Sequence, residues 1–544
     1  MDLSRFKIYS QLAAYNAVNE GNAIKKAFVN RKLYIAVLLC VLLSVNAMAW
    51  SGGNGTAGNP YIISSINELS KLNDTVSHYN ASTRNDYAGK YFKLSDSFVS
   101  DYETNYVSFS IGYYTSSDQY PFCGSFDGNN KTLYQKRDLG RPYGALFAKL
   151  GPGAVVRNVV VSGSILAEGG YCAGIVAYSE GTSDHHVQII NCINNTTLTT
   201  KANGDYDYMG GIAAYIKYTD IDKCCNVGNI EAKNSGSQYI GGLVGYCYYI
   251  SSIRNSYNKG QVLNSGSPSS STYVNMGGCV GYILSQVGVN KSYLENCYNI
   301  GDVRTNNNYG AYIGGIVGAC NGNVLNCYNG GTVSNEVSSS AAIAGYLLAY
   351  SEISNCYSRS NCGTKTGGTI SLWGLKVYDA DTPSDVSFFS HTVPAVNDDC
   401  VLDNTILSTT DLCTALNNWR TSVSGSPSLY SAWLDDVSPW DNKGMPRFLT
   451  CTPISVTNFS VSSGNRECNV SWTATGANSC ILYYGSDPDI NNMFLVNNAP
   501  SPFTALRLTN GRTYYFVVKP AGDGSTYCSD NPPSDAVSGT PNCP

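Results

Sequence analysis

The sequence predicts an all-β protein, namely a parallel, right-handed β-helix with a cap at each end, followed by a β-sandwich. Three observations lead to this prediction. The composition, with 54 glycines, 42 tyrosines and only 13% charged residues, is typical of an all-β extracellular protein. Two short phrases recur through the middle of the chain, which indicates a repeat architecture. The last part of the chain changes to longer alternating strands after a proline boundary.

The N-terminal region, residues 1–49, has the pattern of a signal peptide. An apolar run at residues 33–45 follows the basic residues Lys25, Lys26, Arg31 and Lys32, and Ala47-Met48-Ala49 supplies a cleavage site. The run is shorter than the roughly 20 residues that a bilayer span needs. We therefore expect cleavage after Ala49, secretion or outer cell-surface exposure, and no stable membrane span afterwards. The long stretch before the basic cluster suggests that translation starts downstream of Met1.

The charge of the mature chain argues against nucleic acid as a partner. Residues 1–49 hold six Lys/Arg and two Asp/Glu, so their removal changes the net charge from −5 to −9. A net negative surface without a stripe of Lys or Arg repels a phosphate backbone.

The first recurring phrase has the form Ile-x-Asn-Cys-Tyr-Asn-x-Gly-x-Val. Its copies start at Asn158, Asn191, Lys223, Asn255, Asn296, Asn326 and Asn355. A repeat of about 30 residues cannot bury an apolar face alone, so successive units must stack. Stacked parallel strands lie roughly 4.8 Å apart, which turns each repeated position into a ladder. We expect Asn and Gly at the tight coil corners, with stacked Asn side chains hydrogen-bonded to one another.

The second phrase is Gly-Gly-[Ile/Leu]-[Val/Ala]-[Gly/Ala], and it lies between copies of the first. Its copies start at Ala173, Gly210, Gly241, Gly277, Gly314 and Ala341. Two such short, Gly-punctuated strands in each unit predict a parallel β-helix over residues 144–372. If this register is right, deleting one unit, taken as Gly241 to Asn275, should leave a folded protein, whereas deleting half a unit should not.

These phrases resemble the GLUG-motif family of bacterial surface proteins, through residues 241–246 and 314–318. Residues 55–63, 87–94 and 124–133 resemble the segment that precedes such repeats. The resemblance covers about Trp50 to Phe448 and implies a β-helix-like fold and a surface-exposed, often adhesive role. It transfers no catalytic residue. Lys223 and Ser256 depart from the phrase, and the last coil is rich in alanine, which puts only local strand pairing in doubt.

Two capping regions flank the repeats. In residues 50–143, Ser65 to Glu68 form a capping-box pattern, and Leu69, Leu72 and Val76 follow at helical spacing, so a short amphipathic helix should cover the first coil. Residues 373–449 should close the other end. Within them, residues 411–419 predict a short helix, and the aromatic residues around Trp433 and Trp440 are expected to plug the final coil.

Residues 450–541 are predicted to form a separate β-sandwich. Val470-Ser471-Trp472 fits a core strand, and residues 508–518 resemble the strand of fibronectin type III domains that carries the corner tyrosine. Tyr514 is the candidate for that tyrosine, with Phe516 and Val518 pointing inward. Cys543-Pro544 repeats the Cys-and-Pro entry seen at Cys451, so we expect a longer tandem protein, with a simple secreted chain as the alternative.

Most cysteines are expected to be buried thiols, although an exported chain favours disulfides. Cys192, Cys224, Cys297, Cys327 and Cys356 share one repeat position, where Cβ atoms about 4.8 Å apart exceed the ~3.5–4.5 Å of a disulfide. Pairs among the five cysteines of the sandwich region remain open, these being Cys451, Cys468, Cys480, Cys528 and Cys543.

No catalytic, metal or cofactor site is predicted. The chain has no Cys-x-x-Cys, and its histidines (His78, His185, His186 and His391) are scattered. The close acidic pairs of the β-helix and its caps are Asp205/Asp207, Asp398/Asp399 and Asp435/Asp436. Adjacent acids on a strand point to opposite faces, and Asp205 and Asp207 are expected to be solvated in a turn. We therefore expect a non-catalytic adhesion protein that binds glycans or extracellular proteins, its ligand-binding residues unknown. The alternative is a polysaccharide-degrading β-helix lyase or glycosidase.

Overall fold

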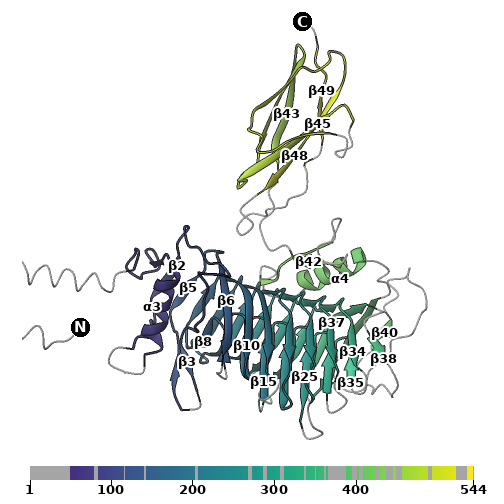
Figure 1. Ribbon diagram of the computed structural model, residues 1–544. Coiled ribbons are helices and arrows are strands. Elements are labelled where there is room, and N and C mark those ends of the chain that lie inside the picture. The colour runs from purple at the N-terminus through teal and green to yellow at the C-terminus, as the bar shows by residue number, and fades with distance from the viewer. Residues whose placement is uncertain are drawn as a thin grey trace, which may run out of the picture.

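The computed structural model describes most of the chain from Trp50 onward. The described residues are 50–78, 84–115, 117–139, 143–201, 206–267, 272–285, 291–306, 311–335, 339–348, 351–359, 363–365, 388–394, 401–402, 409–422, 429–435, 445–448, 456–487, 493–521, 534 and 536–542. The signal-peptide expectation for residues 1–49 lies outside them. The repeats form a parallel β-solenoid, so the predicted fold class is confirmed, and Figure 1 shows its strands stacked along one axis.

Three parallel sheets build the solenoid. The β20 sheet contains β7 (Tyr143–Gly144), β11 (Gly170–Ala173), β15 (Tyr206–Gly210), β20 (Ser237–Gly241), β25 (Val274–Gly277), β30 (Ala311–Gly314) and β35 (Ser339–Ala341). The β21 sheet contains β8 (Phe147–Leu150), β12 (Val176–Glu180), β16 (Ala213–Lys217), β21 (Val244–Tyr248), β26 (Val280–Leu284), β31 (Val317–Asn321) and β36 (Ala344–Leu347). Each Gly-Gly phrase is the corner at which the chain passes from one of these sheets to the other.

The third sheet, the large sheet, carries the Asn-Cys phrase. Before the phrase come β5 (Ser125–Asp127), β9 (Val155–Arg157), β13 (Val187–Ile190), β17 (Thr219–Asp222), β22 (Ser252–Arg254), β27 (Tyr293–Glu295) and β32 (Asn323–Leu325). After it come β6 (Thr132–Leu139), β10 (Val160–Ala167), β14 (Ile193–Thr200), β18 (Cys225–Asn226), β19 (Ile230–Ala232), β23 (Tyr257–Asn258), β24 (Val262–Asn264), β28 (Tyr298–Asn299), β29 (Val303–Thr305), β33 (Tyr328–Asn329), β34 (Val333–Asn335) and β38 (Gly363–Lys365). β37 (Glu352–Arg359) spans both sides of the last copy.

Two asparagine ladders run in opposite directions through the large sheet. The asparagine of each Asn-Cys pair forms a corner, and at Asn296 and Asn326 the backbone there is left-handed, with φ 52° and 53°. In this outer ladder Asn326 Nδ2 donates to Asn296 Oδ1 at 2.7 Å, toward the preceding coil. Three residues further on, Asn258 Nδ2 donates to Asn299 Oδ1 at 2.8 Å, toward the next coil. Lys223 keeps the left-handed corner, φ 54°. The expected asparagine ladders are therefore confirmed, and the substitution at this corner leaves the neighbouring pairing intact.

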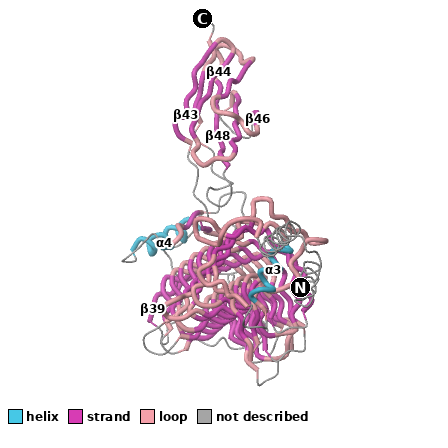
Figure 2. Tube along the Cα trace, turned by 90° about the vertical axis from the view of Figure 1, so that its left-hand side faces the viewer, coloured by secondary structure: helices cyan, strands magenta, loops and turns pink. Residues whose placement is uncertain are grey.

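The interior is divided into two apolar lobes. One lobe lies between the β21 sheet and the strands before the Asn-Cys phrase, and it contains Ile189, Cys192 and Val244. The other lies between the β20 sheet and the strands after the phrase, and it contains Leu198 and Ile240. The inner asparagine ladder separates them, because Asn258 faces the Gly-Gly corner directly. Figure 2 shows the backbone of the solenoid from the end that carries α3 (Ile66–Val76).

The N-terminal end is covered as predicted. β1 (Tyr61–Ile63) and β2 (Tyr91–Leu94) pair in parallel ahead of the repeats, and α3 (Ile66–Val76) buries Leu69, Leu72 and Val76. Ser65 caps the helix by accepting from the Glu68 amide at 3.3 Å. The Glu68 carboxylate accepts from the Ser64 amide at 2.6 Å, one residue earlier than a standard capping box. A small hairpin of β3 (Tyr113–Tyr114) and β4 (Gln119–Tyr120) follows.

The C-terminal cap differs from the expectation. The stack ends on antiparallel strands, β39 (Phe388–Pro394) on β37 and β40 (Val401–Leu402) on β39. α4 (Thr409–Ser422) forms where a helix was predicted, but together with β41 (Trp433–Leu434) and β42 (Arg447–Phe448) it lies along the side of the solenoid. We call α4, β41 and β42 the side cover. Its expected role as a plug is wrong, because Trp433 contacts Tyr298 and Tyr328 on two successive coils rather than the final coil. Trp440 lies outside the described residues.

The last domain is a β-sandwich of two antiparallel sheets. One sheet has the order β43 (Thr457–Gly464), β44 (Glu467–Thr473), β47 (Phe503–Leu506), and the other has the order β46 (Phe494–Val496), β45 (Ser479–Gly485), β48 (Tyr514–Ala521), β49 (Val537–Gly539). Phe516 and Val518 are fully buried, as predicted. The Tyr514 hydroxyl accepts a hydrogen bond from the Thr509 amide at 3.1 Å.

Candidate binding surface

Two columns of tyrosines run along the outer surface where the β20 and β21 sheets meet, and we call them together the tyrosine seam. The seam consists of Tyr171, Tyr208 and Tyr239 from one sheet and Tyr178, Tyr215, Tyr246 and Tyr282 from the other. Each ring is half-buried. Strand alternation turns the neighbouring side chains Gln238 and Ile240 into the interior, so Tyr239 between them faces outward.

From Tyr171 to Tyr246 the rings stack within a column and meet edge to face between columns. The last ring reverses this pattern, because Tyr282 lies at 79° to Tyr246 in its own column and at 20° to Tyr239 in the other. Tyr178 and Tyr215 have ring centroids 4.5 Å apart with planes 8° from parallel, and Tyr215 and Tyr246 are 5.4 Å apart at 6°. Across the corner, Tyr239 and Tyr246 are 5.0 Å apart at 84°. Parallel strands space their side chains by ~4.8 Å, which suits stacking of identical rings. Each such pair stabilises the fold by about 0.5–1.5 kcal/mol beyond its buried area.

The corner between the sheets admits these rings because its backbone carries little side-chain volume. A Cβ at Gly241 would lie 2.0 Å from the Val244 carbonyl oxygen, so no larger residue fits the bend. Ala173, Ala177 and Ala214 are buried in the cluster against which Tyr171 and Tyr208 pack. The repeated glycines therefore create the surface on which the tyrosines pack.

The seam presents ring edges and hydroxyl groups, because most ring faces are covered by the neighbouring ring. Burial raises the pKa of the Tyr208 hydroxyl to about 12, and it raises the pKa of Tyr171, Tyr178, Tyr215 and Tyr246 further above the ordinary value. These phenols stay protonated at physiological pH. The seam is thus a row of uncharged groups that can donate and accept hydrogen bonds.

A charged cluster lies at the N-terminal end of the seam. Lys149 pairs in register with Tyr178, so it takes the tyrosine position one coil earlier. Glu180 accepts from Lys149 Nζ at 3.2 Å and from Lys217 Nζ at 2.9 Å. The Lys149 ammonium also lies 4.8 Å from the centre of the Tyr178 ring. Burial lowers the pKa of Lys149, although Glu180 opposes this effect. These groups satisfy one another, which indicates a structural role.

A second tyrosine ladder lies on the large sheet under the side cover. Tyr257 and Tyr298 stack at 4.7 Å and 1°, and Tyr298 and Tyr328 at 5.0 Å and 3°. Trp433 and Phe448 pack on them, and the Tyr328 hydroxyl donates to the Pro446 carbonyl oxygen. These are the tyrosines of the Asn-Cys-Tyr phrase. They are covered and cannot meet a partner in this arrangement.

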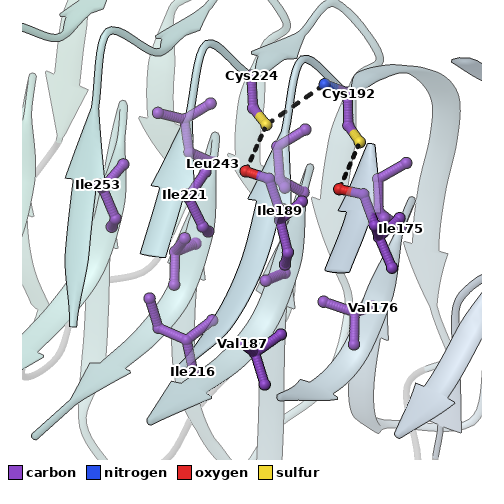
Figure 3. Packing of buried hydrophobic residues seen from close by; sticks show 14 of the residues in the cluster. Ile175, Val176, Val187, Ile189, Cys192, Ile216, Ile221, Cys224, Leu243 and Ile253 are labelled. Atoms are coloured by element: carbon purple, nitrogen blue, oxygen red, sulfur yellow. Dashed lines mark hydrogen bonds between the residues drawn. The ribbon is translucent and has the colours of Figure 1, made fainter. Parts of the chain in front are cut away.

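The cysteine ladder is buried as predicted. All cysteines whose side chains are described are free thiols, including Cys192 and Cys224. The Cys192 amide donates to Cys224 Sγ at 3.4 Å, and that thiol lies 3.5 Å from the Ile189 carbonyl oxygen (Figure 3). In the next coil the Ser256 hydroxyl takes the same place and accepts from the Cys224 amide at 3.0 Å. Cys468 and Cys480 in the sandwich are also free thiols.

Asp207 is not the solvated turn residue that the sequence suggested. It lies in β15 with no exposed surface and accepts from Thr200 Oγ1 at 2.9 Å and Asn234 Nδ2 at 3.3 Å. Burial raises the pKa of this carboxyl group to about 6. The expectation failed because the strand begins at Tyr206, so that Asp207 alternates inward. Asp205, Asp398, Asp399 and Asp436 lie outside the described residues.

The described histidines do not converge on a site. His185 and His186 lie in a loop, and His186 Nδ1 pairs with Asp220 Oδ2 at 3.0 Å. Within the described ranges, no group of three or more His, Cys, Asp or Glu side chains could hold a metal ion. The helices among these residues are all too short or too polar to cross a membrane.

The sequence carries a signal for the seam that the Asn-Cys phrase does not contain. A tyrosine precedes the Gly-Gly corner by two residues and another follows it by four, as in Tyr208 and Tyr215 or Tyr239 and Tyr246. The seam was therefore missed at first, because the Asn-Cys phrase alone points to the covered tyrosines instead.

Comparison with known proteins gives two similarities. Residues 236–263, which span one coil from β20 to β24, match the GLUG motif. One solved structure, described as "a putative immunoglobulin A1 protease from Bacteroides ovatus", is 18% identical, and the alignment covers 74% of this chain and 95% of that chain with a TM-score of 0.39. A search of curated proteins finds no match.

Proposed function

We propose that this chain is an exported, non-catalytic surface protein that binds glycans or extracellular proteins along the tyrosine seam. The observation that carries the proposal is the seam itself, two columns of half-buried phenols that extend from Tyr171 to Tyr282 on the outside of the solenoid. Aromatic residues with a polar tip are enriched at binding surfaces, since they combine apolar area with a hydrogen-bonding group.

The chemistry of the seam favours an extended partner that is rich in hydroxyl or amide groups. Most ring faces are stacked on one another, so a sugar ring would meet edges and hydroxyl groups rather than an open platform. Phenol groups spaced by one coil, ~4.8 Å, suit a partner that runs along the solenoid axis. The GLUG motif at residues 236–263 lies on this part of the molecule and accords with a surface protein.

Export and the identity of the second domain belong to the same proposal. The apolar run at residues 33–45 with its cleavage site supports secretion or surface display. A fibronectin type III-like assignment for residues 456–542 is supported by sheets of three and four antiparallel strands and by the hydrogen bond between Tyr514 and the backbone of Thr509. Such a domain would serve as a spacer or an additional binding module.

The test is a binding screen of the purified protein on glycan arrays and host extracellular proteins, with a screen for polysaccharide cleavage alongside. For any ligand found, the double variant Tyr215→Ser/Tyr246→Ser should weaken binding at least about tenfold, a loss of roughly 1.4 kcal/mol. Tyr273→Ser, at an exposed tyrosine outside the seam, is the matched control and should bind normally. Equal binding by the seam variant would remove the seam from the proposal, and cleavage of any polymer would favour the enzyme alternative.

A further inference from the structure

We propose that the tyrosine seam is a site of oxidative cross-linking, at which a peroxidase and hydrogen peroxide join stacked tyrosines of consecutive coils as dityrosine. The geometry points to two pairs above all. Tyr178 and Tyr215 have ring centroids 4.5 Å apart, and Tyr171 and Tyr208 have centroids 4.8 Å apart, with the rings 8° and 6° from parallel.

Proximity is the first requirement for coupling, because two phenoxyl radicals must meet before either is quenched. The register fixes these rings as permanent neighbours, since Tyr178 pairs with Tyr215 and Tyr171 with Tyr208 along parallel strands. Their ortho carbons lie about one strand spacing apart, ~4.8 Å, and the rings must tilt toward each other to bond. Half-buried rings on an outer surface have room for that tilt, in contrast to rings in a packed core.

The chemistry balances with peroxide as the oxidant. Each of two phenols gives up one electron and its hydroxyl proton, and the two radicals join through their ortho carbons. The hydrogen on each joined carbon then returns to the phenol oxygen, which restores both aromatic rings. Hydrogen peroxide takes the two electrons and two protons and becomes two molecules of water.

The first pair also has a close phenol neighbour. Tyr114 stacks on Tyr178 at 4.3 Å, and the hydroxyl groups of Tyr114, Tyr178 and Tyr215 interact with one another. Burial and the Glu180 carboxylate raise the pKa of Tyr178, so its proton leaves together with the electron rather than before it. A radical formed at one phenol therefore has an identical neighbour with which to react.

The consequence would be a covalent staple between coils. No disulfide joins the cysteines that the structure describes, so the stacked coils are held by hydrogen bonds and packing. A carbon–carbon bond between coils would restrict the unfolded chain in the way a disulfide does and raise the melting temperature.

The experiment treats the purified protein with horseradish peroxidase and hydrogen peroxide, then reads dityrosine fluorescence and maps cross-linked peptides by mass spectrometry. Links Tyr178–Tyr215 and Tyr171–Tyr208 are expected within one molecule, with a rise in melting temperature. Tyr215→Phe keeps the ring but cannot form a phenoxyl radical, so it should lose the first link and retain the second.

The covered ladder is an internal control of equal stacking. Tyr298 and Tyr328 should yield no link, because the side cover and the fold bury both rings. Products confined to the exposed Tyr206 and Tyr273, links only between molecules, or an unchanged peptide map in Tyr215→Phe would each overturn the proposal. Denatured protein should lose the preference for register-matched pairs, and persistence of that preference would also count against a role for the fold.

Discussion

Asn258 and Gly242 face each other across the narrow middle of the solenoid, where a Cβ added to Gly242 would lie 2.3 Å from Asn258 Cγ. The same Cβ would lie 2.1 Å from the Gly278 carbonyl oxygen. The inner asparagine ladder thus occupies the space that the second glycine of each Gly-Gly phrase leaves open. In the last coil, Ala342 replaces this glycine where Ser358 replaces the asparagine in register.

Gly242→Ala should therefore destabilise the solenoid by about 1–3 kcal/mol, the usual range for forcing volume into a packed interior. Thermal and urea unfolding followed by circular dichroism would measure the change. Gly58→Ala is the matched control, since a Cβ there meets nothing within 4 Å. An unchanged melting temperature in Gly242→Ala would show that the middle of the solenoid is less tightly packed than these distances require.

The buried thiols should be unreactive in the folded protein. Burial raises the pKa of Cys224 well above its ordinary value, and the adjacent Cys192 thiol raises it further. The thiolate is the reactive form, so labelling by a disulfide reagent should stay slow up to about pH 9. Full labelling is expected once guanidinium unfolds the chain. Rapid native labelling of Cys192 or Cys224, identified by mass spectrometry, would contradict the buried ladder.

Asp207 should make the protein less stable as the pH rises. Its folded-state pKa is about 6, above the ordinary 3.8, so the folded state holds a proton that the unfolded state releases between these values. The contribution is fully favourable below pH 3.8 and is lost as the pH rises through 6, at a cost of at most about 3 kcal/mol.

Asp207→Asn should flatten the dependence of unfolding free energy on pH between 4 and 6, because the amide keeps an oxygen for Thr200 without a titrating proton. The measurement is urea unfolding at several pH values. Asp184→Asn, in an exposed loop, should leave the slope unchanged. If the unfolding free energy depends on pH equally in Asp207→Asn and in the parent protein, then groups other than Asp207 cause that dependence.

The solenoid could be predicted because the same residue types recur at equivalent positions in successive coils, and each recurrence defines the same strand register. Positions such as Asn296 and Asn326 recur with left-handed corners and matching partners, so one correct alignment fixes all coils. Asp207 was misread for a local reason, since a Gly-Asp-Tyr-Asp-Tyr stretch has turn composition while the strand starts at its middle tyrosine.

The side cover shows what a repeat pattern cannot predict. Its helix was evident from local spacing, and Leu412 and Leu416 are indeed buried. Trp433 packs on one face of the solenoid through contacts between residues far apart in the sequence. These contacts do not recur from coil to coil, so the repeat pattern does not predict that face. The tyrosine seam was overlooked although its spacing is written in the sequence, because half-buried aromatic residues can fill a corner or meet a partner with the same pattern.

The last prediction concerns removal of one coil, for which the structure changes the boundary that the sequence suggested. Ile240 pairs with Met276 and Gly241 with Gly277, so the repeating unit is residues 241–276. Deleting Gly241 to Asn275 leaves both Ile240 and Met276 and puts one extra residue into the strand. Since strand side chains alternate, this slip would turn the residues before the junction, including Tyr239, toward the wrong face.

Deletion of residues 241–276 should therefore fold with native-like circular dichroism, because solenoid stability is close to a sum over neighbouring coils. Deletion of residues 241–275 should melt at a lower temperature, by several degrees, since the strand must accommodate a bulge or a flipped register. Peroxidase cross-linking tests the register of the first variant independently, because removal of Tyr246 makes Tyr215 the in-register neighbour of Tyr282. A Tyr215–Tyr282 link together with a folded spectrum is the expected outcome, whereas equal melting temperatures for the two deletions would refute the register.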